Sequence, residues 1–127
     1  MDKTVRELVW QRSKGRCEAC GLPLDEETWD FSHRKAKSNF SKRGETPDFV
    51  ENGMAIHHFP CHMVSVENHP VLARQKGWRV PSYRDPRTEP IALYGAIWVH
   101  LNANGTYAEV KDPELLLYYT SLQKEGK

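Results

Sequence analysis

Two short groups of cysteine and histidine residues constrain this chain more than any other feature of its sequence. The first is CEACG, in which Cys17 and Cys20 stand three positions apart, and the second is HHFPCH, which contains Cys61. Two closely spaced ligand pairs on separate turns are the usual way to build a tetrahedral zinc site. The chain has three cysteines, an odd number that argues against a disulfide framework. We therefore expect a reduced protein whose fold is braced by a structural Zn²⁺ ion.

The fourth ligand of this site is expected to be a histidine, and two candidates precede Cys61. His58 keeps the two-residue gap of a tight knuckle, whereas His57 leaves a gap of three residues. The spacing favours His58 and leaves His57 open as the alternative. The predicted structural zinc ligands are Cys17, Cys20, His58 and Cys61.

Charge and hydropathy exclude several classes of protein. Eighteen Lys and Arg against seventeen Asp and Glu give a formal net charge of +1, so any nucleic-acid binding must depend on local clusters of basic residues. No stretch approaches the roughly 18 apolar residues of a membrane span. The first residues, MDKTVRELVW, lack the apolar region of a signal peptide. We expect a soluble, cytoplasmic protein without membrane partners.

Apolar spacing and turn signals predict an α+β fold. The main unit is expected to be a zinc-braced domain over residues 1–80. The expected elements of this unit are a helix over 3–14, strands over 28–32 and 52–56, and helices over 61–67 and 71–76.

Residues 81–127 are expected to form a C-terminal extension that packs on the same domain. It begins in VPSYRDPRTEP, where three prolines predict an extended arm that either wraps the core or spans to another surface. The segments AIWVHL and TYAEV flank Asn104 and Gly105, a pair typical of a hairpin turn. Asp112 and Pro113 then fit the N-cap and first position of a final helix.

The segments between and around the two ligand pairs resemble a known family. FSHRKAKS and ENGMAIHHFPCH, in this order and spacing, resemble the HNH endonucleases, and HPVLARQKGWRVPSYRDP is similar to the tail of small HNH proteins of actinobacterial phages. The resemblance covers about residues 5 to 90. It implies a ββα-metal core, in which a β-hairpin and a following helix are braced by a zinc ribbon, and an enzyme that hydrolyses phosphodiester bonds of DNA.

Carried over by position, the resemblance assigns three catalytic residues. His33 matches the general base, Asn52 the residue that orients the loop or the base, and His62 the ligand of a catalytic divalent metal, Mg²⁺, Mn²⁺ or Ni²⁺. Histidine suits this work because its pKa lies near neutrality, and a cation stabilises charge on the phosphate. Ser32 stands where family members commonly have an aspartate or histidine that binds this metal, so either Asp30, water and substrate phosphate complete the coordination, or activity is weak or lost.

A run of basic residues follows His33 and is the candidate DNA contact. Such side chains bind backbone phosphates without reading the base sequence. The expected partner is double-stranded DNA, and the resemblance suggests work with a phage terminase on genome ends. The predicted DNA-binding residues are Arg34, Lys35, Lys37, Lys42 and Arg43.

Two other functions fit parts of the sequence. An inactive HNH-fold zinc module that binds DNA or a partner protein is favoured by Ser32 and by Val66, which stands where many family members have another histidine. A zinc-stabilised adaptor without nucleic acid is favoured by the proline-rich arm, the near-neutral charge and the apolar LLLYY of the last helix.

Overall fold

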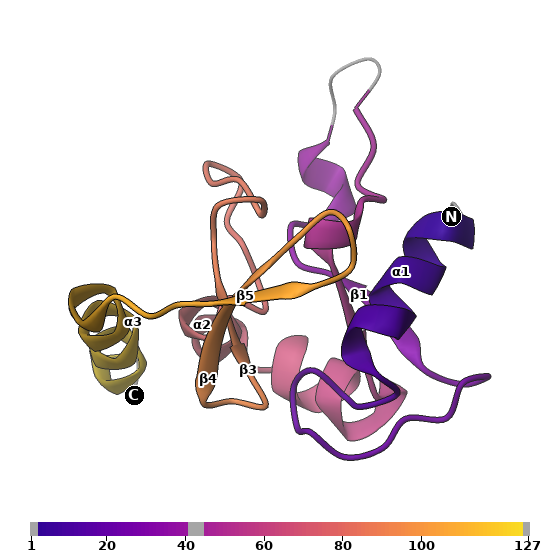
Figure 1. The fold of residues 1–127 in the computed structure, drawn as a ribbon, viewed down its shortest axis with the longest axis horizontal. Coiled ribbons are helices and arrows are strands. Elements are labelled where there is room, and N and C mark those ends of the chain that lie inside the picture. The colour runs from indigo at the N-terminus through magenta and orange to yellow at the C-terminus, as the bar shows by residue number, and fades with distance from the viewer. Residues whose placement is uncertain (1–2, 41–44, 126–127) are drawn as a thin grey trace.

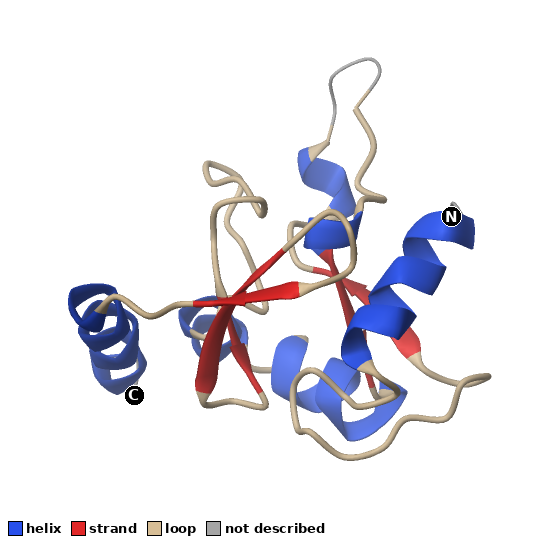
Figure 2. Ribbon diagram, viewed as in Figure 1, coloured by secondary structure: helices blue, strands red, loops and turns tan. Residues whose placement is uncertain are grey.

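Helices and two small antiparallel sheets follow one another along the chain (Figures 1 and 2). The structure is a computed structural model that describes residues 3–40 and 45–125. The mixture of elements is the α+β class that the sequence predicts. In chain order the elements are α1 (Lys3–Ser13), β1 (Asp30–His33), η1 (Lys37–Asn39), η2 (Val50–Asn52), β2 (Gly53–Ile56), η3 (His58–Val66), α2 (Pro70–Gln75), β3 (Ile91–Leu93), β4 (Ile97–Leu101), β5 (Tyr107–Glu109) and α3 (Pro113–Glu125).

Strands β1 and β2 form a hairpin that runs into the helical segment η3. Asp30 lies opposite Ile56 and His33 lies opposite Gly53, so the two ends of β1 are next to different parts of the chain. All four residues of β2 are buried, because α1 covers one side of the hairpin and Met54 and Ile56 belong to the largest core cluster. The buried cluster under α1 contains Val9, Trp29, Val50 and Ala55.

The second sheet has the order β3-β4-β5 and contains one strand more than predicted. The hairpin of β4 and β5 was expected, and β3 was not. All three residues of β3 are buried, so its apolar run lacks the alternation that indicates a strand. This sheet shares the largest core cluster with the cysteine turns, β2 and η3. The cluster comprises Cys17, Ala19, Met54, Ile56, Cys61, Val66, Ala73, Trp78, Ile91, Leu93, Val99 and Leu101.

The proline-rich arm, residues 80–90, wraps the core, which was one of the two predicted arrangements. It is held by Arg34, whose side chain is fully buried. The guanidinium donates Nη1–H to Pro86 O at 2.9 Å, Nη2–H to Glu89 O at 2.7 Å and Nε–H to Gly77 O at 2.8 Å. One side chain from the loop after β1 therefore fixes both the arm and the end of α2.

The final helix begins as the sequence predicts. Asp112 Oδ1 accepts a hydrogen bond from the backbone N–H of Glu114 at 2.9 Å, which caps α3. Leu116 and Tyr119 pack against Trp98 of β4, and the two rings stack with centroids 5.0 Å apart. Among the described residues, no helix is both long and apolar enough to cross a membrane.

Gly77 lies where the chain turns from α2 towards the arm, and replacing it tests this junction. Its φ is +72°, and a Cβ there would lie 2.0 Å from the carbonyl oxygen of Pro90. We expect Gly77→Ala to lower the free energy of unfolding by about 2–4 kcal/mol. The alanine would be strained at a positive φ, and the backbone at Pro90 would also have to move away from its Cβ. Urea unfolding followed by circular dichroism measures this.

Gly95→Ala is the matched control for that experiment. Gly95 also has a positive φ, +80°, but the nearest atom to its Cβ would be Lys76 Nζ at 3.7 Å. The free energy of unfolding of Gly95→Ala should fall only by the cost of the left-handed conformation, about 1 kcal/mol. Equal losses in the two variants would contradict the close approach at Pro90.

Candidate metal centres

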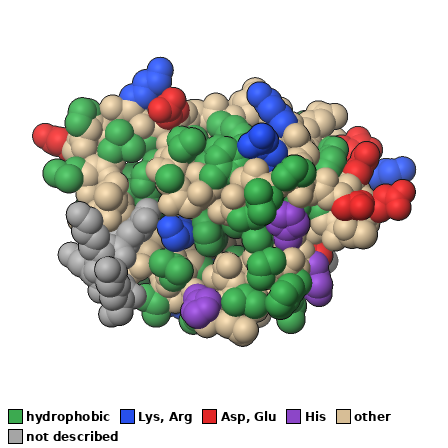
Figure 3. Space-filling view, turned by 90° about the horizontal axis from the view of Figure 1, so that it is seen from below, with side chains coloured by type: hydrophobic (Ala, Val, Ile, Leu, Met, Phe, Trp, Pro, Cys, Tyr) green, Lys and Arg blue, Asp and Glu red, His purple; other side chains and the backbone are tan. Residues whose placement is uncertain are grey.

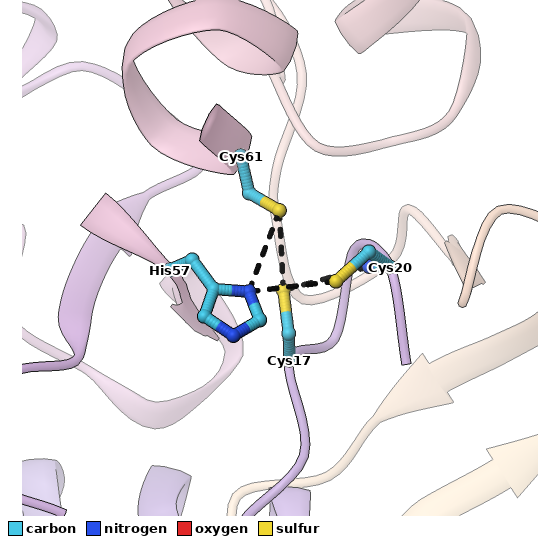
Figure 4. A group of neighbouring side chains, drawn as sticks. All are labelled: Cys17, Cys20, His57 and Cys61. Carbon is cyan, nitrogen blue, oxygen red and sulfur yellow. Dashed lines mark hydrogen bonds between the residues drawn. The ribbon is translucent and has the colours of Figure 1, made fainter. Parts of the chain in front are cut away.

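Four side chains from two distant turns converge on one point (Figure 4). Cys17 Sγ lies 3.6 Å from Cys61 Sγ. His57 Nδ1 lies 3.4 Å from Cys20 Sγ and 3.6 Å from Cys61 Sγ. We call this group, Cys17, Cys20, His57 and Cys61, the Cys3His cluster.

The geometry of the Cys3His cluster fits a tetrahedral metal ion. Bond lengths of about 2.3 Å to sulfur and about 2.0 Å to nitrogen give S···S and S···N edges of about 3.8 and 3.6 Å. The observed separations are close to these values. Pro23 O lies 2.9 Å from His57 Nε2 and can only accept, so Nδ1 is left free to bind a metal. The backbone N–H of Cys20 also points to Cys17 Sγ, at 3.5 Å.

The thiols of this cluster are poorly suited to ionise without a cation. Burial raises the pKa of Cys61, and the neighbouring Cys17 raises it further. Burial also raises the pKa of Cys17. Metal binding supplies the positive charge that favours thiolates and releases their protons. The cluster can therefore hold a structural metal ion.

Of the two candidate histidines, the one that lies with the cysteines is His57, the alternative, and not His58, which the spacing favoured. His57 faces the sulfurs, whereas Nδ1 of His58 lies 2.7 Å from Asp30 Oδ2. The backbone is extended at His57, with φ −65° and ψ 140°, and again at Phe59. In an extended chain neighbouring side chains point to opposite sides, so only one of two adjacent histidines can reach the cysteines.

A second group of possible metal ligands lies on the other side of the same turn. Asp30 Oδ2 is 2.7 Å from His58 Nδ1 and 2.8 Å from His62 Nδ1, and the three ligand atoms lie within 4.8 Å of one another. We call these three residues the Asp30 cluster. Burial acts to raise the pKa of Asp30, but hydrogen bonds with His62 and His58 outweigh it and leave the pKa lowered. The carboxylate is thus ionised near neutral pH.

Glu67 supports the ring of His62 from behind. Its Oε1 lies 3.3 Å from His62 Nε2 and 2.6 Å from Arg79 Nη2. A carboxylate behind an imidazole fixes the ring and leaves the other nitrogen for a metal, as in many metal sites. Glu67 is not among the residues predicted from the sequence, because an isolated acid at the end of a short helical segment gives no signal of such a role.

The two clusters share one turn of chain. His57 and Cys61 serve the Cys3His cluster, and their direct neighbours His58 and His62 serve the Asp30 cluster. Histidine side chains reach the surface among mainly hydrophobic ones on the face shown in Figure 3. Phe59 and Met63, which belong to the same segment η3, are exposed. A metal ion in the first cluster would therefore also set the geometry of the second.

His33 does not join the Asp30 cluster. Its Nε2 donates to Asp48 Oδ1 at 2.7 Å, and its ring lies 5.0 Å from that of Phe31. Because side chains alternate along β1, Phe31 and His33 lie on one face and Asp30 lies on the other. Three residues separate His33 from Asp30, roughly 10 Å along the strand. His33 and His62, the two histidines that the resemblance assigns to catalysis, therefore contact different acidic residues, Asp48 and Asp30.

Asn52 holds the ends of the loop that follows β1. Its amide accepts from the backbone N–H of Lys35 at 2.7 Å and donates to Lys35 O at 3.1 Å and to Pro47 O at 2.9 Å. The side chain is fully buried. Of the two alternatives, orienting the loop or the base, these contacts belong to the loop.

The predicted basic run is only partly available for DNA. Arg34 is buried and bound to backbone carbonyls, so its assignment as a DNA contact is wrong. Its guanidinium serves the arm instead. The ammonium of Lys35 lies 5.0 Å from the ring centroid of Phe40, and Lys37 is exposed. Lys42 and Arg43 lie outside the described residues.

A buried ion pair positions the cysteine turn. Glu18, between the two cysteines, accepts from Arg12 at 2.6 and 2.8 Å, from the backbone N–H of Ala55 at 2.8 Å and from Tyr107 Oη at 2.6 Å. Both charged side chains are fully buried. This network links α1, β2 and β5 to the turn that carries Cys17 and Cys20.

A scan against protein-family models finds no match for this chain, and searches of curated proteins and of solved structures find no match either. The functional conclusion therefore depends on the residues and their geometry.

Proposed function

We propose that the chain is a metal-dependent nuclease of the HNH type, which hydrolyses phosphodiester bonds of DNA. In this proposal the Cys3His cluster holds a structural Zn²⁺ ion, and the Asp30 cluster holds a catalytic divalent cation, Mg²⁺, Mn²⁺ or Ni²⁺. The observation that carries the proposal is the Asp30 cluster itself, a carboxylate and two imidazoles on a hairpin and the helical segment after it. Three protein ligands leave positions for water and phosphate oxygens.

Each residue has a role that its contacts support. A cation at this site would stabilise charge on the phosphate and lower the pKa of a bound water. Asp30 supplies the negative charge, and Glu67 holds the ring of His62. Asp48 fixes His33 with its Nε2 protonated, which leaves Nδ1 able to accept a proton, the form a general base needs.

A second candidate function is a metal-braced binding module without catalysis. Its supporting observation is that His33 and Asp30 point to opposite faces of β1, so a base and a cation do not meet in the free protein. Ser32, which shares the face of Asp30, is buried and is a poor metal ligand in place of the aspartate or histidine that the family commonly has there.

Nicking of supercoiled plasmid separates the two candidates. We expect cleavage that requires an added divalent cation. Asp30→Asn should reduce the cleavage rate by more than the roughly 10–100-fold loss that is typical when a residue behind a metal ligand is replaced. His69→Ala is the control, because His69 is exposed and belongs to neither cluster. Cleavage by Asp30→Asn at the wild-type rate would remove the Asp30 cluster from the proposal.

The same assay tests the general base. His33→Ala should abolish the cation-dependent nicking if Nδ1 of His33 accepts the proton from water. Full activity in this variant would show that the role implied by the resemblance does not belong to His33, while leaving the cation site in place. No cleavage by the wild-type protein with any of the three cations favours the binding module.

A further inference from the structure

Two hollows meet where α2 lies against the proline-rich arm. One, of about 370 Å³, lies between α2, the arm and α3, and the other, of about 360 Å³, lies between α2, the arm and the loop after β1. The two hollows have five lining residues in common. We call this common lining the arginine wall; it consists of Arg74, Arg79, Val80, Pro81 and Tyr83.

The arginine wall is suited to an anion. The hollow beside the loop is lined by arginine and uncharged side chains, with no acidic residue among them. Arg74 is exposed, and among the described side chains no carboxylate forms an ion pair with it. Arg79 keeps one carboxylate partner, Glu67. One guanidinium can donate two parallel hydrogen bonds to the oxygens of a phosphate. Two arginines on one wall therefore suit a phosphate ligand.

The same place offers contacts for a nucleobase. Tyr83 is 80% exposed, with Arg84 Cζ 5.8 Å from its ring centroid, so most of the ring surface is available for stacking by a base. Gln75 lines the larger hollow, and its Oε1 atom is buried with no hydrogen-bond partner among the described residues. A side-chain amide has both donors and an acceptor, so Gln75 beside the hollow suits the polar edge of a base.

We infer that the arginine wall binds an unpaired nucleotide of single-stranded nucleic acid, with its phosphate at Arg74 and Arg79 and its base against Tyr83. Hollows of this size admit one nucleotide at a time, which favours a single strand over a duplex. Glu67 contacts both Arg79 and His62, so a strand held here lies close to the Asp30 cluster. The choice of nucleic acid over other phosphate compounds rests on the proposed nuclease function.

Fluorescence anisotropy with a labelled oligodeoxynucleotide, single-stranded or in a duplex, tests the inference without cleavage. All proteins carry Asp30→Asn, and no divalent cation is added. We expect Tyr83→Ala to weaken single-strand binding about tenfold with the salt dependence unchanged, because it removes stacking. Arg74→Ala should weaken binding and lower the slope of log K against log salt by about 0.7, one phosphate contact.

Arg87→Ala is the matched control. Arg87 lies on the same arm, its side chain is 54% exposed, and it lines neither hollow. It should bind the single strand as the parent protein does. Duplex binding as tight as single-strand binding, or unchanged affinity in both the Arg74 and Tyr83 variants, would overturn the inference.

The binding assay and the plasmid assay fail independently. If the wild-type protein nicks plasmid but these variants bind normally, the nuclease proposal stands and the arginine wall is not its strand site. If the variants lose single-strand binding but no protein cleaves, the arginine wall is a binding site on a protein without nuclease activity.

Discussion

Replacing Cys61 by serine is expected to remove the structural metal proposed for the Cys3His cluster and to unfold the chain. Cys61 is buried in the largest core cluster and contributes one of three sulfurs to the Cys3His cluster. Structural zinc is worth about 10–16 kcal/mol in zinc-finger peptides, as much as the whole stability of a typical domain, about 5–15 kcal/mol. We therefore expect metal content to fall from about one equivalent to near zero and the cooperative thermal transition to disappear.

Elemental analysis after removal of loosely held metal, with circular dichroism on the same samples, measures both effects. The adjacent histidines supply a matched pair. His57→Ala should lose the metal, since its Nδ1 lies within 3.4–3.6 Å of two sulfurs, and His58→Ala should keep it, since its ring contacts Asp30. The reverse result would restore the ligand set favoured by spacing and refute the geometry described above.

Replacing Arg34 by methionine is expected to lower the free energy of unfolding by about 3–5 kcal/mol, the usual cost of breaking a buried charged network. Burial, followed by the neighbouring Arg12, lowers the pKa of Arg34 to about 9, so it is still charged at neutral pH. Its charge is balanced by carbonyl dipoles, and methionine leaves those carbonyls buried without a donor. The accepting carbonyls are those of Glu51, Gly77, Pro86, Glu89 and Pro90.

Urea unfolding measures this loss, and Lys35→Met is the control. Lys35 is next in sequence and only half-buried, and the one contact described for its ammonium is with the ring of Phe40. Its replacement should change stability by less than about 0.5 kcal/mol. Limited proteolysis adds a local readout, because release of the arm exposes residues 80–90 to cleavage. An Arg34→Met protein as stable as wild type, with a protected arm, would contradict the role of the buried guanidinium.

Features encoded by neighbouring residues could be predicted from the sequence. The helix expected over 3–14 is α1, Lys3–Ser13, and Asp112 caps α3 as its position before Pro113 indicated. Asn104 and Gly105 do join β4 to β5. In each case a few consecutive side chains decide the backbone conformation, through capping, turn preference or helical spacing.

The two ligand pairs of the Cys3His cluster could be predicted only in part. The spacing correctly predicted that Cys17, Cys20 and Cys61 lie together, because a tetrahedral site requires only that the two turns that carry the ligands meet. Which of His57 and His58 completes the group depends on the direction of an extended strand relative to the sulfurs. Spacing along the chain does not contain that direction.

By itself the sequence determined the positions of α1, α2 and α3, the hairpin turn and the meeting of the two cysteine-containing turns. Only the tertiary structure decided that Arg34 is buried, that Asp30 meets His58 and His62, and that His33 turns to Asp48 instead. The physical reason is that these contacts join residues far apart in the chain. Arg34 alone reaches carbonyls 17 to 56 positions away. Whether a basic side chain faces solvent or fills a polar gap in the core depends on which distant segments pack around it.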